Sequence, residues 1–175
     1  MTTSKSIRRA APEDISVLTE IRNDAFANKL AHGDYAWGKK MLTDTDVLNI
    51  LSRSFARKEV YVVEQDGVPV ATFTLCLDGE RSDITTWGSP DPLAAYVHRI
   101  CVRKGFNGRG LGSYIVDWCA HELSSLNRRF LRLDCDVRNA TLCAYYESLG
   151  FIRVGTKSTS EDGDYIASLY ERFAH

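Results

Sequence analysis

Four glycines fall within the eight residues Gly105–Gly112, between two segments of contrasting periodicity. The segment before them, Ala94–Val102, is rich in apolar and β-branched side chains and predicts a strand. The segment after them, Ser113–Leu126, has apolar side chains at helical spacing and predicts a helix. Glycine costs backbone entropy, so this density indicates a turn whose N–H groups point into one concavity at a helix N-terminus. Such a turn favours an anion, and phosphate is its usual occupant.

The spacing of these glycines excludes two common phosphate-binding loops. A Walker A loop requires Lys-Ser/Thr after its last glycine, whereas Leu111 and Gly112 follow Gly110 here. A dinucleotide fingerprint requires Gly-x-Gly-x-x-Gly, whereas Gly108, Gly110 and Gly112 are spaced too tightly for it. The turn by itself therefore predicts a phosphate site without naming the ligand, and a strand-to-helix turn without a ligand is the alternative.

The order of the other segments predicts an α/β (α+β) fold with a mixed, largely antiparallel, seven-stranded sheet. Asp66-Gly67 predicts a tight hairpin, because this dipeptide readily adopts positive φ. A long polar loop is expected at Asp78–Pro92, and no linker divides residues 1–175, so a single domain is expected. The strands are expected at Ile7–Ala10, Glu59–Glu64, Val68–Leu77, Ala94–Val102, Phe130–Val137, Ile152–Thr156 and Tyr165–Glu171. About four flanking helices are expected, from near Pro12 to Lys29 and at Asp44–Ala56, Ser113–Leu126 and Asn139–Leu149.

Composition argues against several classes of protein. The 22 Lys+Arg residues balance 23 Asp+Glu and form no basic run, so no nucleic-acid partner is expected. No apolar stretch reaches the roughly 18 residues of a membrane helix, and the polar N-terminus lacks a signal peptide's apolar stretch, so a cytoplasmic protein without a membrane partner is expected. The four histidines lie far apart, so no metal is expected. Five cysteines without a Cys-x-x-Cys motif are interpreted as buried apolar residues: Cys76, Cys101, Cys119, Cys135 and Cys143.

A second motif follows the strand expected at Phe130–Val137. It reads Asn-x6-Tyr-Glu-x-x-Gly-Phe from Asn139 to Phe151. Together with Gly-x-Gly-x-Gly after a strand, it resembles the motif pair of the GCN5-related N-acetyltransferase (GNAT) family, and the element order resembles that family's fold over nearly the whole chain. The resemblance implies an acetyl-CoA-dependent N-acetyltransferase that acts on a primary amine of a small molecule or peptide. The amine would attack the thioester directly, through a tetrahedral intermediate.

The resemblance also implies which residues contact coenzyme A. The strand residues Ile100, Cys101 and Val102 match those whose backbone pairs with the pantetheine arm. Asn139 matches a cofactor-contacting asparagine, and it suits a helix N-cap as well. The residues that match the pyrophosphate cradle are Asn107, Gly108, Arg109, Gly110, Leu111, Gly112 and Ser113.

The cradle departs from the family pattern Gln/Arg-x-x-Gly-x-Gly/Ala at its first position. Gly105 stands where the family has Gln or Arg, which removes one side-chain contact to the pyrophosphate. Arg103 or Lys104 could supply that contact instead.

The resemblance assigns protonation of the leaving thiolate to Tyr146, which also belongs to the cofactor site. A tyrosine of pKa about 10 can return a proton to a thiolate of pKa about 8.5. A base is also needed, because an alkyl amine of pKa about 10.4 is almost wholly protonated at pH 7. His98 is the natural candidate, with Tyr96 or a water relay as the other options, and the period of two places both with Ile100 and Val102 on one strand face. The alternatives are a core aromatic for Tyr146 and a satisfied polar residue within the sheet for His98.

The acceptor site is expected between Ala31–Thr43, Trp87 and Ser160–Asp164. Asp134 and Asp136 alternate with apolar residues and are expected to be solvated, although they could orient a base or bind a cationic acceptor. An aromatic wall is expected from Tyr35, Trp37 and Trp87, and attraction of a cation from Glu161, Asp162 and Asp164; solvated surface loops are the alternative.

Three other hypotheses stay open at this point. The first is a non-catalytic acyl-CoA-binding or regulatory domain, and the second is a toxin-like transferase acting on aminoacyl-tRNA. The third is a covalent acyl-enzyme on Cys101 or Cys135, which is disfavoured because neither cysteine has an obvious nucleophile setting. A homodimer is left open.

Overall fold

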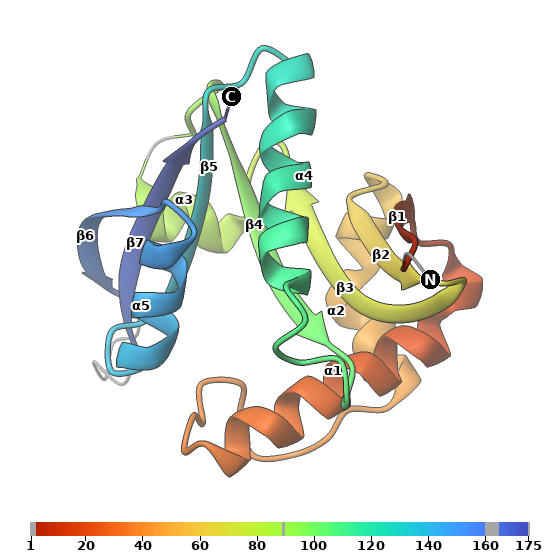
Figure 1. Cartoon of the computed structure of the whole chain (residues 1–175). Coiled ribbons are helices and arrows are strands. Elements are labelled where there is room, and N and C mark those ends of the chain that lie inside the picture. Colours follow the sequence, from red (N-terminus) through yellow and green to blue (C-terminus); the bar gives the residue numbers. More distant parts are fainter. Residues whose placement is uncertain (1–2, 89, 160–164, 175) are drawn as a thin grey trace. The chain divides into compact units, whose positions relative to one another are not determined.

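The computed structural model describes residues 3–88, 90–159 and 165–174, which contain a seven-stranded sheet and five α-helices (Figure 1). The strands are β1 (Lys5–Arg9), β2 (Val60–Gln65), β3 (Val68–Cys76), β4 (Ala94–Val102), β5 (Phe130–Asp136), β6 (Ile152–Ser158) and β7 (Ile166–Phe173). The helices are α1 (Ile15–Ala31), α2 (Asp44–Ala56), α3 (Arg81–Trp87), α4 (Leu111–Ser125) and α5 (Ala140–Ser148), with a 3-10 turn at Pro12–Asp14. None of the helices in the described ranges has the length and apolar character that crossing a membrane requires.

The sheet has the order β1-β2-β3-β4-β5-β7-β6 and confirms the predicted mixed, largely antiparallel fold. The pairs β1–β2, β2–β3, β5–β7 and β6–β7 are antiparallel. In contrast, β4 runs parallel to β5, with Ala94–Tyr96 opposite Phe130–Arg132. Parallel neighbours need a crossover connection, and α4 supplies it.

The chain divides into two compact units, which are described separately below. The first unit comprises Met1–Leu75 and His98–Ile115, and the second comprises Cys76–Val97 and Val116–His175. The glycine-rich turn and most of the predicted cofactor residues belong to the first unit, whereas Asn139 and Tyr146 belong to the second. A single domain stays a prediction.

The core of the first unit forms where α1 and α2 cover β2 (Figure 1). Its buried members are Leu18 from α1, Val47 and Leu51 from α2, and Val60 and Val62 from β2. They come from helical spacing on one side and strand alternation on the other, so each element buries one apolar face.

The second unit contains a helix that the sequence did not predict. The expected loop Asp78–Pro92 includes α3, which starts where Asp83 Oδ2 accepts a 2.6 Å hydrogen bond from the Glu80 N–H. This helix buries two polar residues, Asp83 and Thr86, while its apolar Ile84 is 45% exposed. An apolar stripe is the signal by which a helix is recognised in sequence, and α3 lacks one.

Helix α2 begins with a reciprocal cap that fixes the end of the loop before it. The Thr43 Oγ1 accepts a 3.2 Å hydrogen bond from the Asp46 N–H, and the Asp46 carboxylate accepts one of 2.9 Å from the Thr43 N–H. We expect Thr43→Ala to lower the free energy of unfolding by about 1 kcal/mol, because the Asp46 N–H loses its acceptor. Urea titration followed by circular dichroism would measure this change. Thr43→Ser keeps the hydroxyl and should stay within a few tenths of a kcal/mol of the wild type, and an equal loss in both variants would refute the cap.

Candidate functional site

The glycine-rich turn joins β4 to α4 through backbone conformations that favour glycine. Gly105, Gly108 and Gly110 have φ of +84°, +73° and +72°, in the left-handed region that costs other residues free energy. No heavy atom of the described chain lies within 4 Å of the position that a Cβ would take at any of the three. The Tyr114 N–H donates to the Gly110 carbonyl at 3.0 Å, so the amides before it, from Leu111 onward, have no acceptor within the helix. The turn therefore presents an open helix N-terminus, which is suited to an anion.

Strand β1 fixes the position of this turn within the first unit. Lys5 donates from Nζ to the Arg109 carbonyl at 3.4 Å, and the Lys5 carbonyl accepts a 3.2 Å hydrogen bond from Tyr114 Oη. At the start of the turn, the Phe106 N–H donates to the Arg103 carbonyl at 3.1 Å. The amides of the turn are thus held before any ligand binds.

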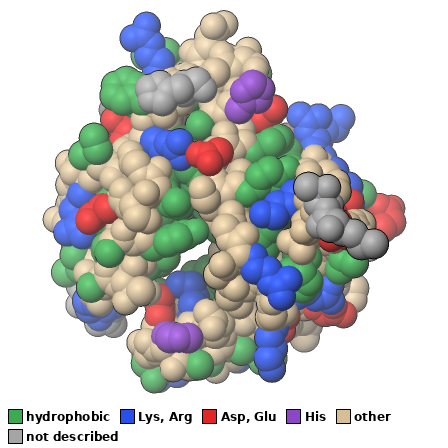
Figure 2. All heavy atoms as spheres, viewed as in Figure 1, with side chains coloured by type: hydrophobic (Ala, Val, Ile, Leu, Met, Phe, Trp, Pro, Cys, Tyr) green, Lys and Arg blue, Asp and Glu red, His purple; other side chains and the backbone are tan. Residues whose placement is uncertain are grey.

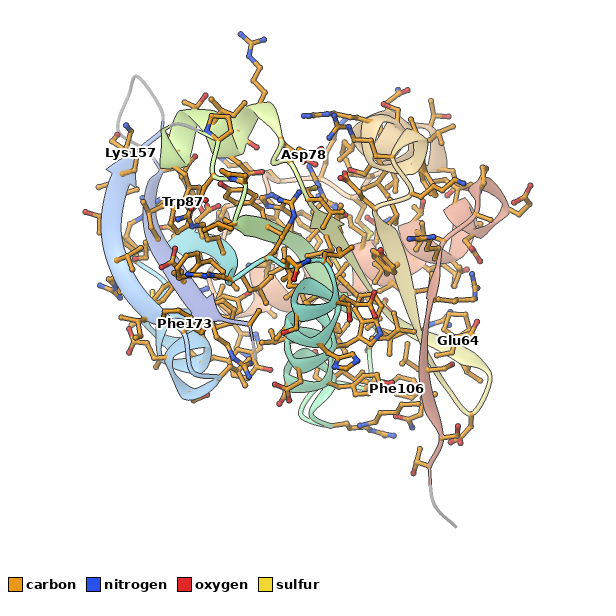
Figure 3. All side chains as sticks on the ribbon, turned by 90° about the horizontal axis from the view of Figure 1, so that it is seen from above. Glu64, Asp78, Trp87, Phe106, Lys157 and Phe173 are labelled. Atoms are coloured by element: carbon orange, nitrogen blue, oxygen red, sulfur yellow. The ribbon has the colours of Figure 1, made fainter. Side chains whose placement is uncertain are left out.

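The basic side chains of the turn differ in what they already contact. Arg103 is committed, since it donates to Glu20 Oε2 at 2.5 Å and to the Pro69 carbonyl at 3.1 Å. Lys104 and Arg109 have no carboxylate partner among residues 3–88, 90–159 and 165–174, and the Arg109 guanidinium lies 4.8 Å from the ring centroid of Phe106, which Figure 3 labels in this turn. Of the two residues expected to replace the missing first contact, Lys104 keeps an available side chain and Arg103 does not.

Strand β4 (Ala94–Val102) contains one irregular residue, Arg99, which changes an expectation about its faces. Arg99 has φ +53°, a left-handed value that regular strands do not contain. Strict alternation therefore stops between His98 and Ile100, and the single face predicted for Tyr96, His98, Ile100 and Val102 does not follow from the period of two. The predicted pantetheine-binding residues Ile100, Cys101 and Val102 all come after this break.

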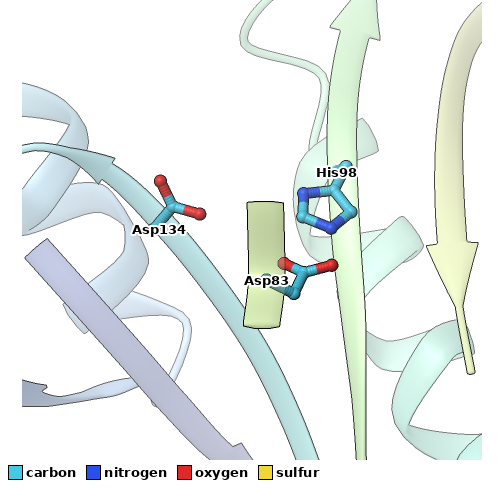
Figure 4. Close-up of side chains that lie close together, drawn as sticks. All are labelled: Asp83, His98 and Asp134. Carbon is cyan, nitrogen blue, oxygen red and sulfur yellow. The ribbon is translucent and has the colours of Figure 1, made fainter. Parts of the chain in front are cut away.

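The two candidate bases on β4 have different surroundings. Tyr96 is buried, its Oη accepts a 3.4 Å hydrogen bond from Arg132, and its ring packs edge-on against Trp87. Figure 4 draws His98 on β4, with Asp83 on α3 and Asp134 on β5. His98 is half-buried and belongs to the first unit, whereas Tyr96 belongs to the second.

In the second unit, Asn139 caps α5 as expected. Its Oδ1 accepts a 3.0 Å hydrogen bond from the Leu142 N–H. Tyr146, in the last turn of this helix, is half-buried and packs against Phe151 and Tyr170, with ring centroids 5.9 and 6.3 Å away. Aromatic packing at Tyr146 is therefore present, and it does not exclude a role for the hydroxyl.

The strand carboxylates are less solvated than expected. Asp136 is 8% exposed and receives hydrogen bonds from Arg138, of which the shortest is 2.6 Å, so its predicted solvation is wrong. Asp134 is half-buried and accepts a 2.9 Å hydrogen bond from Tyr165, whose pKa is raised by burial first and by this carboxylate second. Both carboxylates are held by local partners rather than by solvent alone.

The expected aromatic wall involves both units. Tyr35 is 64% exposed, and Trp37 lies between the cations of Arg22 and Lys29, at 5.6 and 4.8 Å from its ring centroid. Trp87 belongs to the second unit, so the wall stays a prediction. The acidic residues Glu161, Asp162 and Asp164 lie outside the described residues.

The first unit contains a cavity of about 240 Å³ that sequence analysis did not identify. Six of its lining residues are apolar: Leu18, Trp37, Leu42, Val47, Ile50 and Leu51. Arg22 and Arg99 also line it, together with Thr72, Thr74 and Cys101. One sequence signal could have indicated it, because Arg22 is a charged residue within the apolar stripe of α1.

One wall of the cavity is the loop between α1 and α2, and Asn23 holds that loop on α1. The Asn23 side chain donates to the Leu42 carbonyl at 2.8 Å and accepts from the Leu42 N–H at 3.0 Å. Both backbone groups of Leu42 are therefore bound by one side chain, which fixes this side of the cavity.

The comparisons with known proteins agree with this fold. A family profile described as acetyltransferase (GNAT) family matches residues 16–151. The uncharacterized N-acetyltransferase YesJ of Bacillus subtilis (strain 168) is 26% identical over 120 residues, which cover 68% of this chain and 66% of YesJ. A GNAT-family acetyltransferase structure from Listeria monocytogenes has a TM-score of 0.77 and 25% identity, covering 97% of this chain and 94% of that one. The structure of yncA, a putative acetyltransferase from Salmonella typhimurium with its cofactor acetyl-CoA, has a TM-score of 0.67 and 18% identity, covering 98% and 94%.

The cysteines near the site are buried thiols. All five are free and buried, and burial raises the pKa of Cys101 to about 12 and that of Cys119 still further. We expect the native protein to react with Ellman's reagent at pH 8 at less than one thiol, because the thiolate is the reactive form. The same protein in guanidinium chloride should react at five thiols, which provides the control. Fast reaction of Cys101 in the native state, identified by mass spectrometry, would show that the thiol is accessible and activated.

Proposed function

The chain belongs to the acetyltransferase (GNAT) family, and from this membership we propose that it transfers an acetyl group from acetyl-CoA to a primary amine of a small molecule or peptide. The observation that carries the proposal is the turn between β4 and α4. Its left-handed glycines, the open amides at the start of α4 and the available Lys104 and Arg109 side chains suit the pyrophosphate of coenzyme A. The relative from Salmonella typhimurium was solved with acetyl-CoA, which supports the same donor here.

Direct transfer is the mechanism that we propose. The amine nitrogen attacks the thioester carbonyl, the tetrahedral intermediate collapses, and the C–S bond breaks to release the coenzyme A thiolate. Tyr146 returns a proton to that thiolate, and a base removes a proton from the amine nitrogen. A covalent route through Cys101 is disfavoured, because burial holds this thiol protonated at neutral pH.

We propose His98 rather than Tyr96 as the base. Tyr96 is 3% exposed and already accepts a hydrogen bond from Arg132, which in turn pairs with Asp91 and Glu171. For Tyr96 to act as a base, its hydroxyl would have to give up the hydrogen bond from Arg132. The buried guanidinium of Arg132 would then lose one of its hydrogen-bond partners. His98 is half-buried, and an imidazole can both accept and donate a proton, which suits proton transfer.

The other two hypotheses are less well supported. The face drawn in Figure 2 shows lysine and arginine side chains interspersed with acidic and apolar ones, which does not favour a tRNA substrate. A regulatory domain would need to bind acetyl-CoA without releasing a thiol. The deciding experiment incubates the protein with acetyl-CoA and a panel of amines and measures free thiol. Acceptor-dependent release supports transfer, whereas tight acetyl-CoA binding without release for any amine favours the regulatory domain.

Tyr146 can be tested against its neighbour on the same helix. We expect Tyr146→Phe to lower kcat by about 100-fold and to leave the Kd for acetyl-CoA nearly unchanged, because a leaving-group acid acts in the transition state. Tyr145→Phe is the matched control, since on an α-helix its side chain points about 100° away. Stopped-flow thiol release and calorimetry would measure the two quantities. Equal losses in both variants, or a loss of acetyl-CoA affinity alone, would contradict the assignment.

Arg109 provides a test of the cradle. We expect Arg109→Gln to weaken acetyl-CoA binding about tenfold, because a hydrogen bond to a charged group contributes about 1.5 kcal/mol or more. The variant should also show a weaker dependence of Kd on salt. Arg9→Gln removes the same charge from an exposed position on β1 and should bind acetyl-CoA as the wild type does. Titration calorimetry at two salt concentrations measures both, and unchanged affinity in Arg109→Gln would remove this residue from the site.

A further inference from the structure

The cavity of the first unit contains a cation that has no carboxylate partner in the described part of the chain. Arg22 lies on α1 one turn after Leu18 and one turn before Phe26, both of which are buried. Its only hydrogen bond to the described residues is a 3.3 Å contact with Asn23 Oδ1. Its guanidinium lies 5.0 and 5.6 Å from the ring centroids of Phe26 and Trp37. Arg22 is half-buried, and this burial lowers the pKa of its guanidinium.

Several other arginines of this chain are paired with carboxylates. Arg8 pairs with Asp14 and Glu64, and Arg103 pairs with Glu20. The most informative contrast is Arg132, which is also desolvated and which binds two carboxylates at 2.9 and 2.7 Å. Burying a charge is costly unless a partner of opposite sign is present. The aromatic rings beside Arg22 offset part of the cost of burying its charge through cation–π contacts. They leave the N–H donors of the guanidinium without an acceptor from the rings.

A second arginine, Arg99 of β4, lines the same cavity. It has the left-handed backbone described above, which departs from the dihedral angles of a regular strand. The charges of Arg22, Lys29 and Arg99 all act on Cys101, which lines this cavity, and they oppose the effect of burial on its pKa. Two arginines, Arg22 and Arg99, therefore line a small and largely apolar cavity whose lining includes no carboxylate.

The size of the cavity limits what it can hold. Ligand pockets for drug-sized molecules have volumes of roughly 300–1,000 Å³, and this one has about 240 Å³. The cavity therefore favours a small molecule such as an amino acid over a much larger sugar-based polyamine. The six apolar lining residues favour an aliphatic or aromatic side chain rather than a polar one.

We propose that this cavity binds the carboxylate and the side chain of a small apolar α-amino acid, whose amine is the group acetylated. The carboxylate accepts hydrogen bonds from Arg22 and Arg99, and the apolar side chain contacts Leu18, Val47 and Leu51. The inference rests on the proposed acetyl transfer and specifies its acceptor. It differs from the cationic acceptor that the acidic loop suggested in sequence, because the charge lining the cavity is positive.

The proposal is tested with acceptors that differ only in the carboxylate. L-Leucine, L-methionine and L-phenylalanine are each compared with the amine that remains after decarboxylation, namely 3-methylbutylamine, 3-(methylthio)propylamine and 2-phenylethylamine. Thiol release gives kcat/KM for each, with kanamycin as a polycationic control. We expect at least one acid to exceed its amine by about 30-fold, in line with one or two hydrogen bonds to a charged group. Amines that react as well as their acids, or a preference for kanamycin, would overturn the proposal and leave acetyl transfer itself intact.

Variants at Arg22 locate the preference. Arg22→Met keeps most of the stem and should raise KM for the preferred acid about 30-fold, while kcat/KM for the matching amine and the Kd for acetyl-CoA change little. Arg22→Lys keeps the charge without the two-pronged geometry and should recover part of the affinity. Arg8→Met, which removes an arginine paired with Asp14, should leave the ratio of acid to amine as in the wild type. An unchanged ratio in Arg22→Met, with acetyl-CoA still bound, would rule out this residue as the carboxylate partner.

A binding measurement separates the two hypotheses. Titration of the protein with each amino acid and amine by calorimetry needs no turnover. Arg22-dependent binding of an acid without thiol release for any acceptor would support the cavity assignment and refute the transfer. Absence of both binding and release for all three acids would overturn the cavity assignment as well.

Discussion

The first amides of every α-helix have no hydrogen-bond acceptor within the helix. In this chain the first amides of α4 follow a turn from β4 that requires left-handed backbone. Gly105, Gly108 and Gly110 allow the turn, and Lys5 of β1 holds it from outside through the Arg109 carbonyl. The donors are therefore arranged by the fold rather than by a ligand, so binding an anion there does not have to pay for ordering them. The proposed donor site depends on this one arrangement.

Much of this could be read from the sequence, and the reasons for the failures are specific. The glycine density predicted the turn, and all seven strands were expected close to where they lie, because backbone freedom and strand propensity are local properties. Helix α3 was missed because it buries Asp83 and Thr86 and exposes Ile84, the reverse of the pattern by which helices are recognised. The shared face on β4 stays a prediction, because the positive φ of Arg99, which nothing in the sequence marks, removes the strict alternation on which it was based. The pairing of Asp136 with Arg138 was equally invisible in the alternating pattern.

The cavity beside α1 contains a residue to which the sequence analysis gave no role. Arg22 is a charged residue within an apolar stripe, and such residues are often long side chains that reach solvent. In the structure its stem lies along the buried face and its guanidinium stays near Phe26 and Trp37. Only the three-dimensional contacts reveal that the neighbouring acids pair with other cations. Lys29 is bound to Asp34 and Arg103 to Glu20, whereas Arg22 has no carboxylate partner among the described residues.

The clamp between Asn23 and Leu42 has a consequence for how such a chain can diverge. One side chain on α1 holds both backbone groups of Leu42, and Thr43 then starts α2 through its own cap. The residues between the end of α1 and this clamp are consequently not needed to hold α2 in position. They can be exchanged, shortened or lengthened over generations while the helix after them stays anchored. In a protein built in this way, substitutions in this one loop can change which acceptor is bound without destabilising the fold.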